Sequence, residues 1–349
     1  MIRSDGCNSG ILASVGRSFC EVATIRKGIE AGALNYRLAL GLRDRDHVTD
    51  FHHVRAAASE AGVNVRVLLD LPASRPRIGY MEDKAFRVGD TVWIIDAEEV
   101  DPGDPGAIPL PGLRHHVDRL HPGDRVVFRD GRQIFRITTI NEGRLEVECS
   151  AAVEPLSASN GCSFPDSGAV FEPLTTEDRE WLARMASEGL CPDWVTVSLV
   201  AEQEQIRTVR NCLDELWPEG SIRIVPKIET AYAVDNLAAI LDVADGVLLG
   251  RGDLALSVPP ERLPHIQMRV AQEARRANKA YMVATQVFER FADSGAIYRA
   301  ELSDVALMVR QGVDAVTLCQ ETSDSRYPIA TIDLVRRIIE QESKILRES

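Results

Sequence analysis

Short apolar runs recur along the chain and alternate with longer stretches of helical hydrophobic period. The helical stretches include Val48–Ala61, Glu202–Leu216, Ala231–Val243 and Arg262–Asn278. Eight strand–helix units in regular alternation are typical of a (β/α)₈ TIM barrel, so an α/β fold of this kind is predicted. The predicted strands are Ile11–Val15, Leu34–Leu38, Val65–Leu69, Trp194–Ser198, Ile222–Lys227, Gly246–Leu249, Ala280–Ala284 and Ala315–Leu318.

One connection, between the third and fourth predicted strands, is too long for a simple crossover. A barrel of ~250 residues leaves about 100 residues over. Residues 80–165 contain closely spaced β-like segments separated by turn signals, such as Asp101–Gly106. We therefore predict a barrel formed by residues 1–79 and 166–349, with a small antiparallel β-barrel domain inserted as a lid after strand three. Its predicted strands are Thr91–Ile95, Arg125–Phe128, Gln133–Thr139 and Arg144–Cys149.

The helical pattern resumes near Thr176, after the predicted insert. Thr175 or Thr176 is the expected N-cap, because acidic residues follow within the first turn.

Composition excludes several classes of partner. The net charge of −13 argues against nucleic acid and against anionic membranes. No apolar run approaches the ~18 residues that a membrane span needs, and the polar segment Met1–Gly10 lacks a signal-peptide core. The seven cysteines are scattered, with no C-x-x-C pair. These features predict a cytoplasmic protein with reduced cysteines.

Polar side chains follow seven of the eight predicted strands. The catalytic groups of a (β/α)₈ barrel lie just past the C-terminal ends of the strands. A single site on that rim is therefore predicted. The rim residues are Arg37, Asp70, Ser198, Lys227, Glu229, Arg251, Asp253, Thr285, Gln286, Glu321 and Thr322.

The chemistry of this rim centres on two carboxylates and a lysine. Glu229 and Asp253 offer hard oxygen ligands suited to Mg²⁺ or Mn²⁺. Lys227 lies two residues before Glu229, so both point to the same side of an extended segment. A lysine beside a metal can stabilise an enolate or a transferring phosphoryl group, and Gly252 allows a ligand to approach the backbone closely. The alternative is a buried Lys–Glu–Asp network that only stabilises the rim.

Several motifs occur in an order and spacing that resemble the pyruvate kinase family. The similarity is strongest from Val225 to Pro328 and weaker before it, where Leu69-Asp70 leads to Arg77-Ile78-Gly79. The strong motifs are Val225-Pro226-Lys227-Ile228-Glu229, Gly250-Arg251-Gly252-Asp253-Leu254, Ala284-Thr285-Gln286, Arg299-Ala300-Glu301-Leu302-Ser303-Asp304-Val305-Ala306, Leu318-Cys319-Gln320-Glu321-Thr322 and Tyr327-Pro328.

The resemblance implies a phosphotransferase that acts on phosphoenolpyruvate or a similar 2-oxo acid. Lys227 would neutralise the phosphoryl group and the enolate. Glu229 and Asp253 would hold Mg²⁺ or Mn²⁺. The implied substrate contacts are Thr285 with the backbone amides of Gly252 and Asp253 at the carboxylate, and Arg37 and Ser198 at the phosphate.

Departures from the family pattern affect the monovalent-cation site. After Arg37 the family has asparagine and serine ligands, whereas this chain has Ala39 and Gly41. A threonine after the strand-three aspartate is replaced by Leu71. Only Asp70 remains of the side chains that would bind K⁺. We therefore predict that K⁺ has little effect.

Further departures lie on the nucleotide side. A histidine, a lysine and an arginine of the family are replaced at Leu42, Pro72 and near Ala201, and a lysine pair is replaced near Ser159 and Asn160. Because ADP carries about three negative charges that need cationic partners, weak binding of ADP and ATP is predicted. Arg129 or Arg132 in the insert are the available compensating cations.

Three functions remain open on these residues. The first is a phosphotransferase with an altered acceptor. The second is a metal-dependent 2-oxo-acid lyase, aldolase or decarboxylase, which needs only the metal and enolate groups. The third is a non-catalytic binding protein derived from a kinase. The sequence ends about one helix after Pro328, so we expect it to lack the family's C-terminal regulatory domain. The oligomeric state stays open, with a homo-oligomer among the alternatives.

Overall fold

The computed structural model describes residues 10–42, 44–100, 106–168, 170–218 and 222–348. The chain forms two compact units, one from Met1–Ala73 with Glu172–Ser349 and the other from Ser74–Phe171. The limits predicted for the insert, residues 80 and 165, fall inside the second unit. Nearly all of the polar N-terminal segment and of the predicted turn 101–106 lies outside the described residues, so those two interpretations stay predictions.

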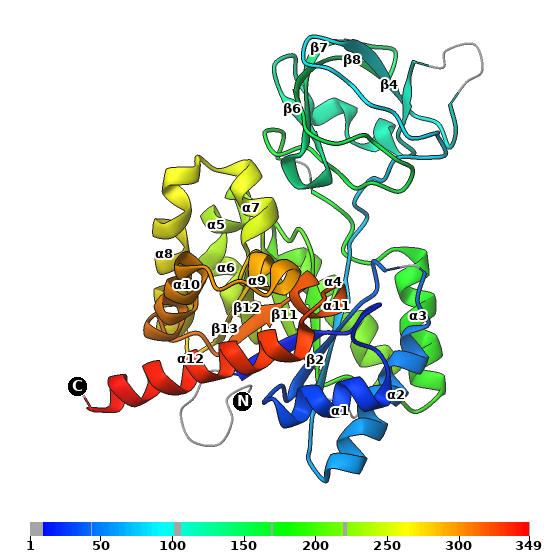
Figure 1. Ribbon diagram of the computed structural model, residues 1–349. Helices are drawn as coiled ribbons and strands as arrows, with labels where there is room; N and C mark the ends of the chain where they lie inside the picture. The colour runs from blue at the N-terminus through cyan, green and yellow to red at the C-terminus, as the bar shows by residue number, and fades with distance from the viewer. Residues whose placement is uncertain (1–9, 43, 101–105, 169, 219–221, 349) are drawn as a thin grey trace. The chain divides into compact units, whose positions relative to one another are not determined.

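Eight parallel strands close into a barrel in the order β1-β14-β13-β12-β11-β10-β3-β2 (Figure 1). The ring closes where β1 pairs with β14, with Leu12 opposite Thr317. This arrangement confirms the predicted fold, and each strand lies within two residues of its predicted bounds. The strands are β1 (Gly10–Ser14), β2 (Asn35–Ala39), β3 (Arg66–Leu71), β10 (Trp194–Val197), β11 (Arg223–Ile228), β12 (Gly246–Gly250), β13 (Ala280–Ala284) and β14 (Ala315–Leu318).

Helices follow the barrel strands and cover the outside of the ring (Figure 1). Thr175 caps the helix that resumes after the insert: its side chain accepts from the Asp178 amide at 3.1 Å, and the Asp178 carboxylate accepts from the Thr175 amide at 2.9 Å. This reciprocal capping box satisfies two backbone donors and confirms Thr175 as the N-cap. The helices are α1 (Val22–Glu30), α2 (His47–Ala61), α3 (Thr176–Ser187), α4 (Gln203–Leu216), α5 (Ala231–Asp235), α6 (Leu237–Val243), α7 (Arg251–Ser257), α8 (Leu263–Arg276), α9 (Glu289–Ser294), α10 (Arg299–Arg310), α11 (Gln320–Ser323) and α12 (Pro328–Glu348), with a 3₁₀ turn η4 (Pro260–Arg262).

The predicted helix Ala231–Val243 is wrong as a single element. It divides at Asn236 into α5 and α6. The Asn236 side chain donates to the Ala201 carbonyl at 2.9 Å, in the loop after β10. Asparagine readily exchanges helical backbone bonds for such side-chain bonds, and a tertiary contact of this kind leaves no mark on the local hydrophobic period.

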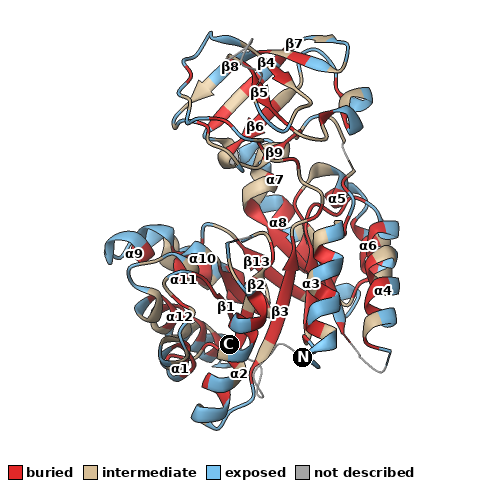
Figure 2. Ribbon diagram, turned by 90° about the vertical axis from the view of Figure 1, so that its right-hand side faces the viewer, coloured by how far each residue is buried: buried red, intermediate tan, exposed pale blue. Residues whose placement is uncertain are grey.

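Apolar side chains fill the barrel in two layers. Alternate strand residues such as Val195, Val283 and Val316 pack outward against the helices, and Figure 2 shows the strands buried while the outer faces of the helices are exposed. The inward-facing layer is a separate cluster of Leu12, Leu68, Trp194, Val225, Leu248, Met282, Ala284 and Ala315. Because strand side chains alternate, the residues two positions further along several of these strands also face the barrel axis, and they are polar: Ser14, Asp70, Thr196, Lys227 and Thr317.

The second unit is a mainly antiparallel β domain, as predicted. Its strands form one six-stranded sheet in the order β5-β4-β8-β7-β6-β9, so β5 and β9 lie at the edges rather than closing a ring. The two edge strands have only two residues each and were not predicted. The elements are β4 (Thr91–Ile95), β5 (Ile108–Pro109), β6 (Arg125–Phe128), β7 (Gln133–Asn141), β8 (Arg144–Ala152) and β9 (Cys162–Ser163), with 3₁₀ turns η1 (Leu113–His115), η2 (Val117–Arg119) and η3 (Arg129–Gly131).

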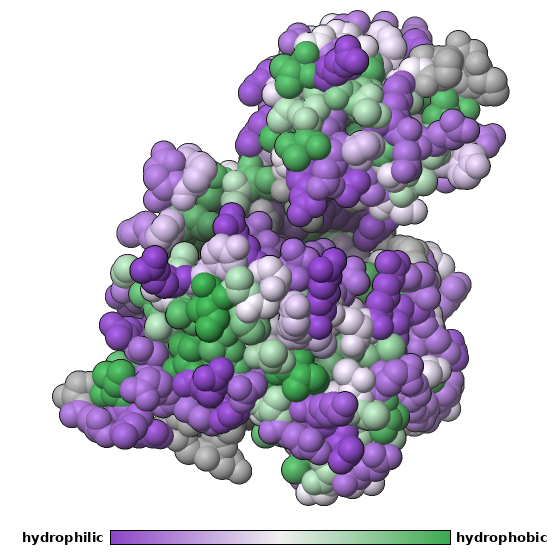
Figure 3. Space-filling view, in the orientation of Figure 1, coloured by the Kyte–Doolittle hydropathy of each residue, from purple (hydrophilic) through white to green (hydrophobic). Residues whose placement is uncertain are grey.

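The surface of the barrel unit carries an apolar groove between α10 and α12. Its cavity volume is about 620 Å³, and its lining includes Leu302, Leu307, Leu334 and Ile338. Hydrophobic side chains gather over these helices in Figure 3. Across the described part of the chain, no helix is both long and apolar enough to cross a membrane, and the six described cysteines are free of disulfides.

Candidate active site

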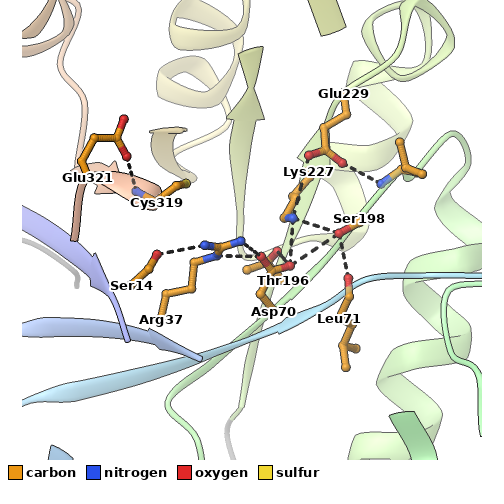
Figure 4. Close-up of polar contacts among 11 residues, drawn as sticks. Ser14, Arg37, Asp70, Leu71, Thr196, Ser198, Lys227, Glu229, Cys319 and Glu321 are labelled. Carbon is orange, nitrogen blue, oxygen red and sulfur yellow. Dashed lines mark hydrogen bonds and ion pairs between the residues drawn. The ribbon is translucent and has the colours of Figure 1, made fainter. Parts of the chain in front are cut away.

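Asp70 is the centre of a buried polar network at the C-terminal end of the barrel strands (Figure 4). Its carboxylate is 3% exposed. Oδ2 accepts from Arg37 Nε at 2.6 Å, and Oδ1 lies 2.9 Å from Lys227 Nζ. Thr196 approaches Oδ1 at 3.4 Å from the same side. The two predicted cations are therefore joined through Asp70, the one side chain that remains of the family's monovalent-cation site.

Lys227 is held in one place by several partners. Its ammonium donates to Ser198 Oγ at 2.9 Å and lies 3.8 Å from Glu229 Oε1. Ser198 in turn donates to the Leu71 carbonyl at 2.8 Å. Lys227 and Glu229 thus lie on the same side of the β11 end, as their spacing predicted.

The charges in this network shift one another's protonation. Burial alone would lower the pKa of Lys227, but Asp70 and Glu229 raise it above its ordinary value. Burial likewise opposes the charge of Arg37, and Asp70 raises its pKa. The pKa of Asp70 is lowered: burial would raise it, and the two cations outweigh that effect. All three groups are therefore ionised at neutral pH.

Glu229 is the exception in this cluster. Burial raises its pKa to about 7, Lys227 opposes the rise, and Asp253 adds to it. One oxygen, Oε2, accepts from the Leu199 amide at 2.9 Å. Asp253 therefore lies close enough to Glu229 to disfavour its charge, and a cation bound by both carboxylates would relieve that repulsion.

Two glycines where β12 passes directly into α7 pack against predicted site residues. A β-carbon on Gly250 would lie 2.5 Å from Glu229 Oε1, and one on Gly252 would lie 2.9 Å from Thr285 Cγ2. Neither space admits a side chain. The glycines of this motif thus bring the junction of β12 and α7 against both the carboxylate and the threonine.

Other predicted rim residues have structural partners. Glu321 accepts from the amides of Val287 at 3.0 Å and Cys319 at 2.6 Å. The Thr322 hydroxyl donates to the Ser14 carbonyl and accepts from the Ser14 amide, both at 2.9 Å. Both residues join strand ends, and neither belongs to the charged network. Arg251 also turns away from it, toward Asp304 and the loop after β13.

Sequence reasoning missed several members of the site. Ser14 accepts from Arg37 Nη1 at 2.9 Å, and Thr196 faces Asp70. The signal for both was an inward-facing polar residue on a strand. Leu199 contributes only its backbone amide, which no side-chain pattern could reveal. Arg37 itself lies inside β2, since the strand continues to Ala39.

Apolar residues lie at or just beyond the ends of β2, β3 and β10. Leu71 and Ala201 are buried, and Leu42 is 38% exposed. Their side chains stand at the positions where the resemblance implies cationic or cation-binding groups. We call the charged cluster at the strand ends the inner layer and these apolar positions, with Pro72, the outer layer; the same loops also carry charged residues such as Arg45, which pairs with Asp50.

A divalent ion fits the inner layer by donor chemistry. Glu229 and Asp253 are carboxylates, and Mg²⁺ is commonly held by one or two carboxylates together with water and substrate oxygens. Among the residues that the structure describes, no group of three or more histidine, cysteine or acidic side chains gathers as a metal cluster. The two carboxylates alone are therefore the proposed protein ligands.

The fold and the site together define a (β/α)₈-barrel protein with a buried lysine–carboxylate cluster at the catalytic end of its strands. A family model described as "Pyruvate kinase, barrel domain" matches residues 7–332. A pyruvate kinase of Agrobacterium vitis is 32% identical over 339 residues, covering 96% of this chain and 68% of the relative. Pyruvate kinases of Methylorubrum extorquens (29%, 95% and 68%) and Mycobacterium tuberculosis H37Rv (32%, 90% and 66%) are similar over comparable shares. The chain belongs to the pyruvate kinase family, as its motifs predicted.

Proposed function

We propose that this protein is a pyruvate-kinase-like enzyme that acts on phosphoenolpyruvate or pyruvate-type substrates through an enolate and that binds nucleotides weakly. The observation that carries the proposal is the placement of the Lys227 ammonium at the barrel end, on a side chain only 12% exposed and 2.9 Å from both Asp70 Oδ1 and Ser198 Oγ. A fixed positive charge in a water-poor site stabilises an anion far more than the same charge in water does.

Lys227 would act on charge that develops in the reaction. Asp70 and Glu229 keep it protonated, and Ser198 orients its ammonium through the bond to the Leu71 carbonyl. A negative charge that forms on the enolate or phosphoryl oxygen would meet an ammonium that needs no reorganisation. Arg37, held by Asp70 and Ser14, would contact the phosphate with its remaining donors.

Glu229 and Asp253 would hold Mg²⁺ or Mn²⁺, which supplies further positive charge beside the substrate oxygens. Thr285 would bind the substrate carboxylate together with the amides of Gly252 and Asp253. The close packing of Gly252 on Thr285 supports this, because it brings the threonine against the first turn of α7, which carries Asp253.

Weak nucleotide binding and weak K⁺ dependence follow from the outer layer. Leu42, Pro72 and Ala201 provide neither a positive charge nor a side-chain oxygen. Asp70 has an arginine on one oxygen and a lysine on the other, so a K⁺ ion would have to compete with two fixed cations.

Exchange of pyruvate methyl protons in D₂O, with Mg²⁺ or Mn²⁺ present, tests the enolate half directly. We expect metal-dependent exchange from the wild-type protein. The control for the variant Lys227→Met in this assay is Lys344→Met, which removes an exposed lysine on α12. If the wild-type protein exchanged pyruvate protons no faster than the metal ion does without protein, the proposal would be overturned. That result would favour a non-catalytic binding protein.

A lyase is the second candidate, because the charged groups in place are those that stabilise an enolate. Dependence on ADP separates the two. Formation of pyruvate and ATP from phosphoenolpyruvate supports the phosphotransferase. Enolisation without any reaction of ADP, at saturating phosphoenolpyruvate, favours the lyase.

A further inference from the structure

Arg251 makes an extensive set of contacts two residues before the proposed metal ligand Asp253. It is the first residue of α7 and is 9% exposed. Nε and Nη2 donate to the Thr285 carbonyl at 3.1 and 2.9 Å, and Nη2 also donates to the Gln286 carbonyl at 3.0 Å. Nη1 donates to both carboxylate oxygens of Asp304, at 2.9 and 2.7 Å. Every guanidinium nitrogen is thus engaged.

The two carbonyls that Arg251 binds belong to a strained turn. Thr285 has φ +77° and Gln286 has φ +56°, so two successive residues with side chains adopt left-handed backbone conformations. Such conformations are uncommon for residues other than glycine and persist where the surroundings hold them. The guanidinium binds the peptide groups of these same two residues, so it is placed to hold the turn.

The turn decides where the Thr285 side chain lies. Thr285 Cγ2 would be 2.9 Å from a β-carbon on Gly252, so the threonine packs directly on the first turn of α7, which contains Asp253. On the far side of the turn, Val287 donates to Glu321 at 3.0 Å. Arg251 therefore connects three elements: the start of α7, the turn after β13, and α10 through Asp304.

We propose that Arg251 is a positioning residue. Oriented by Asp304, it holds Thr285 and Gln286 in the left-handed turn and thereby places the Thr285 hydroxyl beside Gly252 and Asp253 for the substrate carboxylate. This inference rests on the proposed function, because it takes the carboxylate subsite as given.

Arg251→Met removes the guanidinium that holds the turn, which we call the clamp. Arg210→Met is the matched control. Arg210 also binds a carbonyl and a carboxylate, those of Ile222 at 2.6 Å and Asp245 at 2.8 Å, but it does so where β11 and β12 begin, at the opposite end of the barrel. Amide hydrogen exchange of a peptide covering 281–288 reports the turn itself. Oxalate affinity, measured by calorimetry with Mn²⁺, reports the subsite.

We expect Arg251→Met to speed exchange in the turn and to weaken oxalate binding roughly 10–100-fold, the scale of a misplaced binding group. Arg210→Met should leave both unchanged. Adding Gln286→Gly to Arg251→Met should restore part of the affinity, because glycine adopts positive φ without a clamp. Thr285→Val should weaken oxalate binding too, and Arg251→Met should then add little further loss. Asp304→Asn gives a milder test if Arg251→Met does not fold.

If amide hydrogen exchange in the turn is the same in Arg251→Met as in the wild-type protein, Arg251 does not hold the turn and the clamp is refuted. Faster exchange with wild-type oxalate affinity would overturn the positioning role and leave Arg251 as a structural residue. A wild-type protein that binds no oxalate would overturn the proposed function, and the exchange result would still decide the clamp separately.

Discussion

The inner and outer layers of the barrel rim differ in charge although they follow the same strands. In the inner layer the buried Asp70 carboxylate binds both Arg37 and Lys227, whose side chains are 16% and 12% exposed (Figure 4). In the outer layer the loops after β2 and β3 carry apolar residues such as Leu42 and Pro72. Under the proposed function, the substrate half would draw its charge from the strand ends, and the nucleotide half beyond them would lack the cations that ADP needs. The difference teaches how the two halves of such a site could diverge separately.

Loss of the central cation gives the largest expected effect. Lys227→Met should reduce pyruvate proton exchange by about 10²–10³-fold, the loss typical of a removed oxyanion-stabilising donor. The assay is deuterium incorporation followed by NMR. Circular dichroism controls for folding, since the variant leaves Asp70 and Glu229 with one fewer cation. If Lys227→Met exchanged pyruvate protons as fast as Lys344→Met, the proposed role of Lys227 in the inner layer would be refuted.

Loss of either proposed metal ligand ranks next. Glu229→Gln or Asp253→Asn should weaken Mn²⁺ binding by at least about 100-fold, more than changes outside the direct ligands usually cause. Enolisation should fall in parallel. Asp242→Asn, a neutralised surface carboxylate on α6, is the control. Titration of free Mn²⁺ by electron paramagnetic resonance provides the affinity, and unchanged values in both variants would refute the metal site.

The nucleotide half should respond to an added charge. ADP should bind the wild-type protein far more weakly than oxalate does, and Pro72→Lys should raise ADP affinity about tenfold, since a charged hydrogen bond is worth ~1.5 kcal/mol or more. Oxalate affinity should not change. Ile297→Lys, at a position 61% exposed, controls for charge alone. If ADP already binds as tightly as oxalate, the contrast between the layers is wrong. In that case the arginines of the insert that share Glu154, Arg129 and Arg132, are the first compensating groups to examine.

The smallest expected effect is that of K⁺. Activity should change less than tenfold between KCl and tetramethylammonium chloride at constant ionic strength, because Arg37 and Lys227 already neutralise Asp70. Steady-state rates over a range of KCl concentrations measure this. A larger activation specific to K⁺ would mean that oxygen ligands other than those of the family complete a cation site.

Much of the barrel could be predicted from the sequence, because each strand is a short apolar run and the site residues follow these runs directly. Lys227 and Glu229 could be paired by their spacing alone. The role of Asp70 could not, because it depends on Arg37 and Lys227, which belong to other strands. Asn236 divides a helix through a bond to Ala201, and Leu199 uses only its amide. These features arise from tertiary contacts that leave no local pattern.

Closure of the ring has a consequence for the order of folding. Thr196 and Asp70 are 126 residues apart in sequence, and Thr322 and Ser14 are 308 apart, so two seams of the barrel join distant parts of the chain. Long-range pairing is entropically costly and slow to form. The bond between Lys227 and Asp70 links strands on either side of the first seam. The charged cluster therefore requires β3 and β10 to be paired, and pulse-labelled hydrogen exchange should show these two strands protected before the site binds oxalate.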